Sequence, residues 1–220
     1  MRRQRPLTCA LVSGGLDSAV LLHRLLRARH KVVPVYIQCG LRWEAAELHW
    51  LHRVLQCLRT KTLRSLQRIE LPLRSVYRDH WSVIGPRVPH ATSRDAAVYL
   101  PGRNVLLVSA AAILSAQRGV STIALGVLKG NPFGDATPRF FARLAECLTQ
   151  ALSHPIRIIA PLRSLTKAQL IRSAEPACLA FTFSCLNPRG VLHCGRCNKC
   201  AERQRAFRAA GAADPTVYAR

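Results

Sequence analysis

The sequence has few acidic residues and lacks an apolar run long enough to cross a membrane. Only 11 Asp and Glu stand against 33 Lys and Arg in 220 residues, so the formal net charge is +22. A membrane-spanning helix needs about 20 apolar residues, and the longest candidate, 105–116, is interrupted by Ser109. Internal repeats and low-complexity linkers are also missing. With 49% hydrophobic residues, the chain has the composition of a folded domain and not of a disordered tail.

Lysine is also scarce, because only five of the basic residues are lysines and the arginines are scattered along the chain. Dispersed positive charge implies attraction for anions, including nucleotides. A nucleic-acid partner is a lesser alternative to a solvated basic surface. After Met1–Arg5, a short apolar run and two glycines follow where a secretion signal would need a longer apolar stretch. We therefore expect a cytoplasmic protein.

Nine cysteines divide into an isolated group and a cluster. The isolated ones are Cys9, Cys39, Cys57, Cys147 and Cys178. An odd total without a secretion signal predicts reduced thiols, and apolar neighbours make most of the isolated cysteines candidates for small core residues.

The clustered cysteines are Cys185, Cys194, Cys197 and Cys200, within 16 residues. Four thiolates suit tetrahedral Zn²⁺ with no open position, which is the arrangement of a structural site. An iron–sulfur cluster is the alternative, because thiolates alone do not exclude it. The spacing predicts one structural Zn²⁺ per chain.

Strands and helices alternate along the chain. The hydrophobic pattern predicts strands at 7–12, 32–37, 68–71, 122–127 and 156–159, and helices at 18–29, 44–58, 104–118, 138–152, 166–173 and 198–210. Ser164 or Thr166 is expected to cap the helix at 166–173, and 72–98 is expected to be irregular. This order predicts an α/β fold with a doubly wound, Rossmann-like parallel sheet of five strands.

The hexapeptide Ser13–Ser18, with the sequence SGGLDS, lies between the first expected strand and helix. Gly14 and Gly15 allow an anion to approach the backbone closely, and the serine hydroxyls add donors. The following helix directs its free N–H groups to the same place. The segment therefore predicts a phosphate site, with an ordinary tight turn as the alternative.

This hexapeptide resembles the signature loop of the ATP pyrophosphatases, whose fold is adenine nucleotide alpha hydrolase-like. The resemblance implies cleavage of ATP between the α- and β-phosphates, adenylation of a carbonyl oxygen and attack by a nitrogen or sulfur nucleophile. It also implies the ATP-binding residues, with Asp17 near Mg²⁺: Ser13, Gly14, Gly15, Leu16, Asp17 and Ser18.

Further motifs extend the resemblance over essentially the whole chain. They are Pro101–Asn104 (PGRN), Leu165–Ile171 (LTKAQLI), Thr182–Cys185 (TFSC) and His193–Cys200 (HCGRCNKC). Together they resemble the 7-cyano-7-deazaguanine synthases of queuosine biosynthesis. The resemblance implies that 7-carboxy-7-deazaguanine, ammonia and two ATP give the nitrile, with Asp17, Arg103 and Lys167 as catalytic residues. It also implies a homodimer, a catalytic domain at 1–176 and a zinc-binding lobe at 177–220.

Two segments depart from the family pattern where the base should bind. Residues 39–43 read CGLRW where the family usually has Tyr-Gly-Gln-Arg-His, and 126–138 keep little of the family's sequence. We expect Arg42 to meet the 7-carboxylate, Trp43 or Phe133 to stack on the ring, and Asp135 to accept from its polar edge. The alternative is that Trp43 packs in the core and Asp135 caps the helix near Pro138.

Two other functions remain open. Some proteins that resemble this family belong to antiphage defence systems, where the activated deazapurine is joined to a protein amine. The basic charge suggests a tRNA-modifying enzyme as a lesser alternative.

Overall fold

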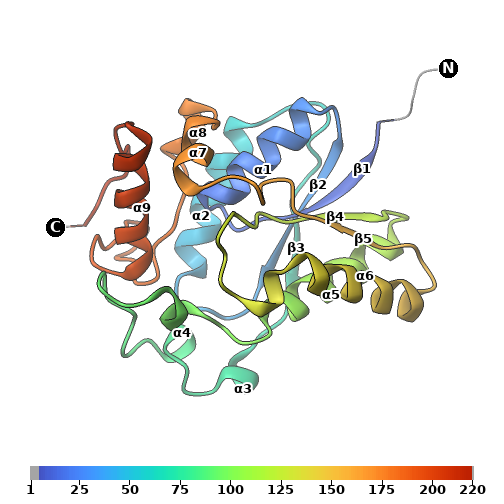
Figure 1. Cartoon of the computed structure of the whole chain (residues 1–220), viewed down its shortest axis with the longest axis horizontal. Helices are drawn as coiled ribbons and strands as arrows, with labels where there is room; N and C mark the ends of the chain where they lie inside the picture. Colours follow the sequence, from blue (N-terminus) through green and yellow to red (C-terminus); the bar gives the residue numbers. More distant parts are fainter. Residues whose placement is uncertain (1–4, 220) are drawn as a thin grey trace.

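In the computed structural model, which describes residues 5–219, five parallel strands form one sheet in the order β3-β2-β1-β4-β5 (Figure 1). The strands are β1 (Leu7–Leu11), β2 (Lys31–Gln38), β3 (Gln67–Glu70), β4 (Thr122–Ala124) and β5 (Arg157–Ile159). The order reverses at β1, so β1 and β4 flank the topological switch point where ligands bind in such sheets. The expected α/β fold with a Rossmann-like parallel sheet is confirmed.

Helices cover both faces of this sheet. The long helices are α1 (Leu16–Arg27), α2 (Glu44–Cys57), α5 (Arg103–Gln117), α6 (Pro138–Leu152) and α9 (Asn198–Ala210). The short helices are α3 (Arg74–Tyr77), α4 (Trp81–Ile84), α7 (Lys167–Arg172) and α8 (Pro176–Leu179), with single 3₁₀ turns at Asp95–Val98 and Gly134–Ala136. No helix among residues 5–219 has the length and apolar character to cross a membrane.

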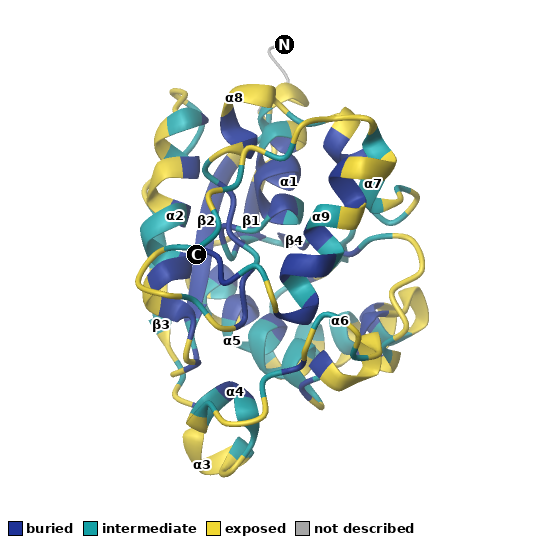
Figure 2. Cartoon of the chain, turned by 90° about the vertical axis from the view of Figure 1, so that its left-hand side faces the viewer, coloured by how far each residue is buried: buried dark blue, intermediate teal, exposed yellow. Residues whose placement is uncertain are grey.

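Alternation along the strands builds two hydrophobic cores. Val32 and Tyr36 of β2 join the core under α1 and α2, whereas Val33 and Val35 join the core under α5. The interiors of the three central strands, β1, β2 and β4, are buried, and the inner sides of the surrounding helices are buried against the sheet (Figure 2). The near-continuous burial of β2 is typical of a parallel sheet that is covered on both faces.

Most expected elements are found with shifted ends. Thr166 caps α7 in a reciprocal capping box with Gln169, and α9 ends at Gly211, whose φ of +68° suits glycine. The fourth strand is shorter than expected and ends at Ala124. The chain leaves the ladder there, and residues 125–127 line a cavity instead.

The prediction that Cys57 and Cys178 are reduced, isolated thiols was wrong. They form a disulfide across 121 residues of sequence. Cys57 ends α2, and Cys178 lies in α8, a helix that the hydrophobic pattern did not reveal. The fold brings these two helices together. The other seven cysteines are free.

Candidate active site

The loop between β1 and α1 has the geometry that its sequence predicted. Gly14 adopts φ +74°, and a Cβ there would lie 3.0 Å from the carbonyl oxygen of Glu47. Only glycine fits this position without strain. The Ser13 N–H donates to Ser18 Oγ at 2.9 Å and holds the loop closed on the start of α1.

Asp17 and Lys167, which are 150 residues apart, meet beside this loop. Lys167 Nζ lies 3.0 and 3.2 Å from the Asp17 carboxylate oxygens and 3.3 Å from Glu202 of α9. Burial alone would lower the pKa of Lys167, but Asp17 and Glu202 outweigh it and raise the pKa above its ordinary value. Lys167 is therefore a held cation next to the phosphate loop.

Glu202 extends this ion-pair network into α9 and was not predicted from the sequence. Burial tends to raise its pKa, but Lys167 and Lys199 outweigh burial and bring the pKa down to about 2. Lys199 Nζ lies 2.5 Å from the Glu202 carboxylate. The charges that face the phosphate loop are therefore fixed partly by the helix that carries the cysteine cluster.

A cavity of about 210 Å³ opens at the carboxyl ends of β1, β2 and β4. Its lining includes Ser13, Asp17 and Ser18 of the loop, Arg103 and Asn104 of α5, Tyr36, Glu47 and Asn131. Arg103 therefore lines the same cavity as the phosphate loop. Its Nε is buried and has no partner among the described residues, which leaves it able to bind a ligand.

Glu47 forms a buried acidic wall of this cavity and was also missed from the sequence. It is 8% exposed, and Tyr36 donates its hydroxyl to Glu47 Oε2 at 2.8 Å. Burial raises the pKa of Glu47 to about 7, although the charge of Arg103 and the Tyr36 hydrogen bond oppose the rise. Its place in the first turn of a helix suggested only an interaction with the helix dipole.

Arg42 and Trp43 do not line this cavity. Trp43 is 5% exposed and stacks on Trp81 with ring centroids 5.7 Å apart, so it has a core position. Arg42 donates to the carbonyl oxygen of Gly85. Glu44 fixes the backbone of the segment 39–43, because its carboxylate accepts hydrogen bonds from Cys39 N and Gly40 N.

Asp135 caps a different helix from the one considered in the sequence analysis. Its Oδ2 accepts from Asn104 N at the start of α5, and Thr137 caps α6 instead. Asp135 is 8% exposed, and its Oδ1 has no partner among residues 5–219. An unpaired buried oxygen is costly, and Asp135 is not among the residues that line the cavity beside the phosphate loop.

Phe133 lines a second hollow, of about 400 Å³, together with Tyr99. The two rings stack with centroids 4.7 Å apart. Gly130 and Pro132 line this hollow, whereas Asn131 lines the first cavity. The segment 130–132 therefore separates the loop cavity from an aromatic surface on which a flat ring can stack.

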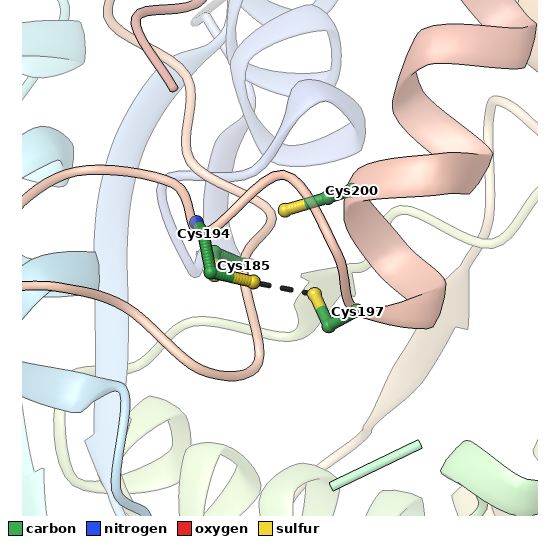
Figure 3. Close-up of side chains that lie close together, drawn as sticks. All are labelled: Cys185, Cys194, Cys197 and Cys200. Atoms are coloured by element: carbon green, nitrogen blue, oxygen red, sulfur yellow. Dashed lines mark hydrogen bonds between the residues drawn. The ribbon is translucent and has the colours of Figure 1, made fainter. Parts of the chain in front are cut away.

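The four clustered cysteines come together in the fold. Their sulfur atoms all lie within 4.8 Å of one another, all four residues are buried, and Cys185 Sγ and Cys197 Sγ are 4.0 Å apart (Figure 3). Zn–S bonds of 2.3 Å in a tetrahedron require sulfur atoms about 3.8 Å apart. The donor set and its dimensions therefore fit one Zn²⁺ with no open position.

Contacts connect this cluster to the phosphate loop. Cys197 is the N-cap residue of α9, and Arg203 of the same helix is buried and donates to Thr182 Oγ1 at 2.9 Å. The adjacent Phe183 N–H donates to the Gly14 carbonyl at 2.9 Å. A metal that fixes the cysteine segment would thereby also fix the loop.

The sheet, the phosphate loop and the network around Lys167 define the class, an ATP-dependent ligase of the Rossmann-like α/β type. The chain belongs to the family described as queuosine biosynthesis protein QueC, whose model matches residues 8–211.

Two curated relatives support this assignment. The chain is 32% identical to "7-cyano-7-deazaguanine synthase 1" of Desulfitobacterium hafniense, over 90% of this chain and 89% of that protein. It is 31% identical to "7-cyano-7-deazaguanine synthase" of Methanothrix thermoacetophila, over 94% and 96% of the two chains.

A solved structure is similar in fold. It is titled "Crystal structure of a 4-thiouridine synthetase - RNA complex with bound ATP" and aligns with a TM-score of 0.53 and 16% identity. The alignment covers 94% of this chain and 50% of that one. This likeness concerns the fold alone.

Proposed function

We propose that this protein converts 7-carboxy-7-deazaguanine to 7-cyano-7-deazaguanine with ATP and ammonia. The observation that carries the proposal is that the phosphate loop and Arg103 line one cavity, and that Lys167 pairs with Asp17 of this loop, in a chain of the QueC family. A carboxylate is a poor electrophile, and adenylation supplies AMP as a good leaving group.

The proposed reaction has two activation steps. A carboxylate oxygen attacks the α-phosphorus of ATP and releases pyrophosphate, and ammonia then displaces AMP to give the amide. The amide oxygen attacks a second ATP in the same way, and loss of AMP and of both amide N–H protons gives the nitrile. In this proposal, catalysis comes from positioning and charge stabilisation.

In this proposal, residues 13–18 bind the phosphates of ATP through backbone N–H groups and serine hydroxyls. Mg²⁺ would be held at Asp17 and would neutralise charge on the departing pyrophosphate. Lys167 and Arg103 stabilise charge that moves onto the phosphates. Because Lys167 is already paired with Asp17 and Glu202, it needs little reorientation when ATP binds.

The deazapurine is assigned to the hollow beside the loop cavity. Its flat face would stack on Phe133, and the unpaired Oδ1 of Asp135 would accept from the amine or N–H at its edge. Arg42 and Trp43 were also expected to contact the base. Their contacts with Gly85 and Trp81 instead support a structural role, in which they hold the segment 39–43 in place.

The four cysteines would hold one structural Zn²⁺ in the lobe at 177–220. The catalytic domain then comprises 1–176. A homodimer is part of the same proposal, and the apolar helix α5 is the candidate for its interface. In the structure, α5 packs on β1, β4 and α6, and its exposed large hydrophobic residues are only Val105 and Ile113. Light scattering at micromolar concentration tests the homodimer, because a monomer mass would contradict it.

A second candidate function uses a protein amine instead of ammonia as nucleophile, as in antiphage defence systems. The segments 39–43 and 126–138 favour it, because they depart from the usual sequence of the family. The same adenylating loop would serve both reactions.

One assay separates the two candidates. The protein is incubated with ATP, Mg²⁺, 7-carboxy-7-deazaguanine and ammonium, and small molecules and proteins are analysed by mass spectrometry. The proposal predicts the amide and then the nitrile. A protein adduct that forms when cell extract replaces ammonium would support the second candidate, and failure to bind 7-carboxy-7-deazaguanine would contradict both.

A further inference from the structure

The segments that lead into the five strands carry basic residues and no acidic residue. These segments are 5–7, 27–31, 58–66, 118–121 and 153–157. Their basic residues are Arg5, Arg27, Arg29, Lys31, Arg59, Lys61, Arg64, Arg118 and Arg157. Because all strands are parallel, these segments meet at one edge of the sheet, opposite the phosphate loop.

Five of the eleven acidic residues lie at or after the carboxyl ends of the strands. Asp17 follows β1, Glu44 and Glu47 follow β2, Glu70 ends β3, and Asp135 follows β4. All the ion pairs formed among residues 5–219 also involve side chains from the carboxyl side or from α9 and the segment after it. The fold therefore separates charges that are dispersed in the sequence.

Two hollows join along the basic edge. One, of about 1480 Å³, is lined by Arg5, Arg29, Lys31, Arg64 and Arg118, and the other, of about 1020 Å³, by Arg59, Lys61 and Arg64. They share Arg64 and Ser65 in their linings, so they are adjacent along this edge. We call these seven basic residues and the hollows they line the basic groove.

The cations of the basic groove lack acidic partners. All seven side chains are exposed, and none forms an ion pair with a carboxylate of the described chain. Arg118 donates to Gln67 Oε1, a neutral acceptor. Seven like charges that face one groove repel each other and attract a polyanion.

We propose that the basic groove binds the phosphate backbone of a double-helical nucleic acid. Five strands at about 4.8 Å spacing make an edge roughly 20 Å wide, enough for several successive phosphates. No Phe, Tyr or Trp lines either hollow. Unpaired bases bind by stacking on aromatic side chains, so the lining favours contacts with backbone phosphates of a duplex.

This binding site is separate from the active site. The groove lies at the amino edge of the sheet, whereas the loop cavity lies at the carboxyl edge. A bound duplex would therefore tether the enzyme without presenting its own bases to ATP. The inference is independent of which small molecule the enzyme adenylates.

Fluorescence anisotropy with labelled 24-base-pair RNA and DNA duplexes tests the proposal. The groove variant combines Lys31→Ala, Arg59→Ala, Lys61→Ala and Arg64→Ala. The control variant removes the same charge from exposed sites on α6 and α9, with Arg139→Ala, Arg143→Ala, Arg205→Ala and Arg208→Ala. Circular dichroism confirms that each is folded, and Arg64→Glu alone tests the shared residue if the fourfold variant unfolds.

The groove variant should lose at least tenfold in affinity at 100 mM salt, and its log–log salt slope should fall by about three to four. The affinity of the control variant for the duplex should stay within about threefold of that of the wild type. The affinities for the RNA and the DNA duplex show which of the two nucleic acids the groove prefers. Equal losses in both variants would show attraction to net charge only and overturn the site. Absence of wild-type binding at about 10 µM, or tighter binding of a single strand, would also overturn the proposal.

Discussion

At the scale of single residues, the ion pair between Asp17 and Lys167 is the feature most closely tied to the proposed chemistry. It places a carboxylate and an ammonium group beside the loop that is proposed to bind ATP phosphates. Asp17→Ala should reduce ATP turnover at least a hundredfold, because it removes the proposed Mg²⁺ ligand and leaves Lys167 with only Glu202 as a partner. Release of AMP measures this effect.

The matched control for that change is Glu146→Ala, which removes one carboxylate from an exposed position on α6. It should retain wild-type turnover, and both variants should keep the wild-type circular dichroism spectrum. Wild-type activity in Asp17→Ala would remove Asp17 from the mechanism.

Glu47 makes stability depend on pH. Its pKa rises from an ordinary value of 4.5 to about 7 on folding, chiefly because of burial. The folded state therefore carries no penalty from this group below pH 4.5 and the full penalty above pH 7. Glu47→Gln keeps an acceptor for Tyr36, so its stability relative to wild type should improve by more than about 1 kcal/mol between pH 4.5 and pH 8.

Urea unfolding at several pH values measures this difference. Glu146→Gln controls for the loss of one carboxyl group from an exposed site. A difference between Glu47→Gln and wild type that is the same at every pH would contradict the account of Glu47.

Some residues of the candidate site can be predicted from the sequence, and others cannot. Short motifs mark Asp17, Arg103 and Lys167, and the fold places all three at or beside the loop cavity. Glu47 could not be predicted, since its acidic side chain in a first helical turn looks like a helix-dipole partner until the fold buries it against Tyr36. Trp43 looked like a stacking surface, but its ring packs on Trp81 of α4, a four-residue helix in a segment that was expected to be irregular.

At the scale of elements, α9 and its contacts connect the cysteine cluster, the proposed Zn²⁺ site, to the phosphate loop. Cys197→Ser removes one proposed Zn²⁺ ligand, and metal binding contributes folding free energy directly. We expect it to lose the metal and several kcal/mol of stability, and to weaken ATP binding through the contact of Phe183 with Gly14. Thermal unfolding and metal analysis measure the first two effects.

Cys147→Ser is the matched control, because Cys147 is a free, exposed cysteine on α6. It should leave the zinc content near one per chain and the unfolding temperature unchanged. Iron and sulfide in the wild-type protein would replace the zinc proposal with an iron–sulfur cluster.

Elements with strong periodicity were predicted well, and those held by tertiary contacts were not. The pattern placed α6 and α9 at their observed bounds because both have clear start or stop signals. It missed α8, which has only four residues and is joined to α2 by the Cys57–Cys178 disulfide. A bond across 121 residues depends on strand order, which spacing does not reveal.

At the scale of the whole molecule, the parallel sheet separates two chemical environments. Its carboxyl edge gathers the phosphate loop, the buried acids and the ion-pair network, and its amino edge gathers unpaired basic residues. Composition predicted attraction for anions but not this division, because the charges are dispersed along the sequence and only the strand directions sort them.

The central claim is that both oxygens of a carboxylate leave as part of AMP. The most direct measurement uses 7-carboxy-7-deazaguanine labelled with ¹⁸O in both carboxylate positions, together with ATP, Mg²⁺ and ammonium. The account predicts two AMP and two pyrophosphate per nitrile, with one ¹⁸O in each AMP and none in pyrophosphate. Formation of ADP, or ¹⁸O that appears in inorganic phosphate or pyrophosphate, would contradict it.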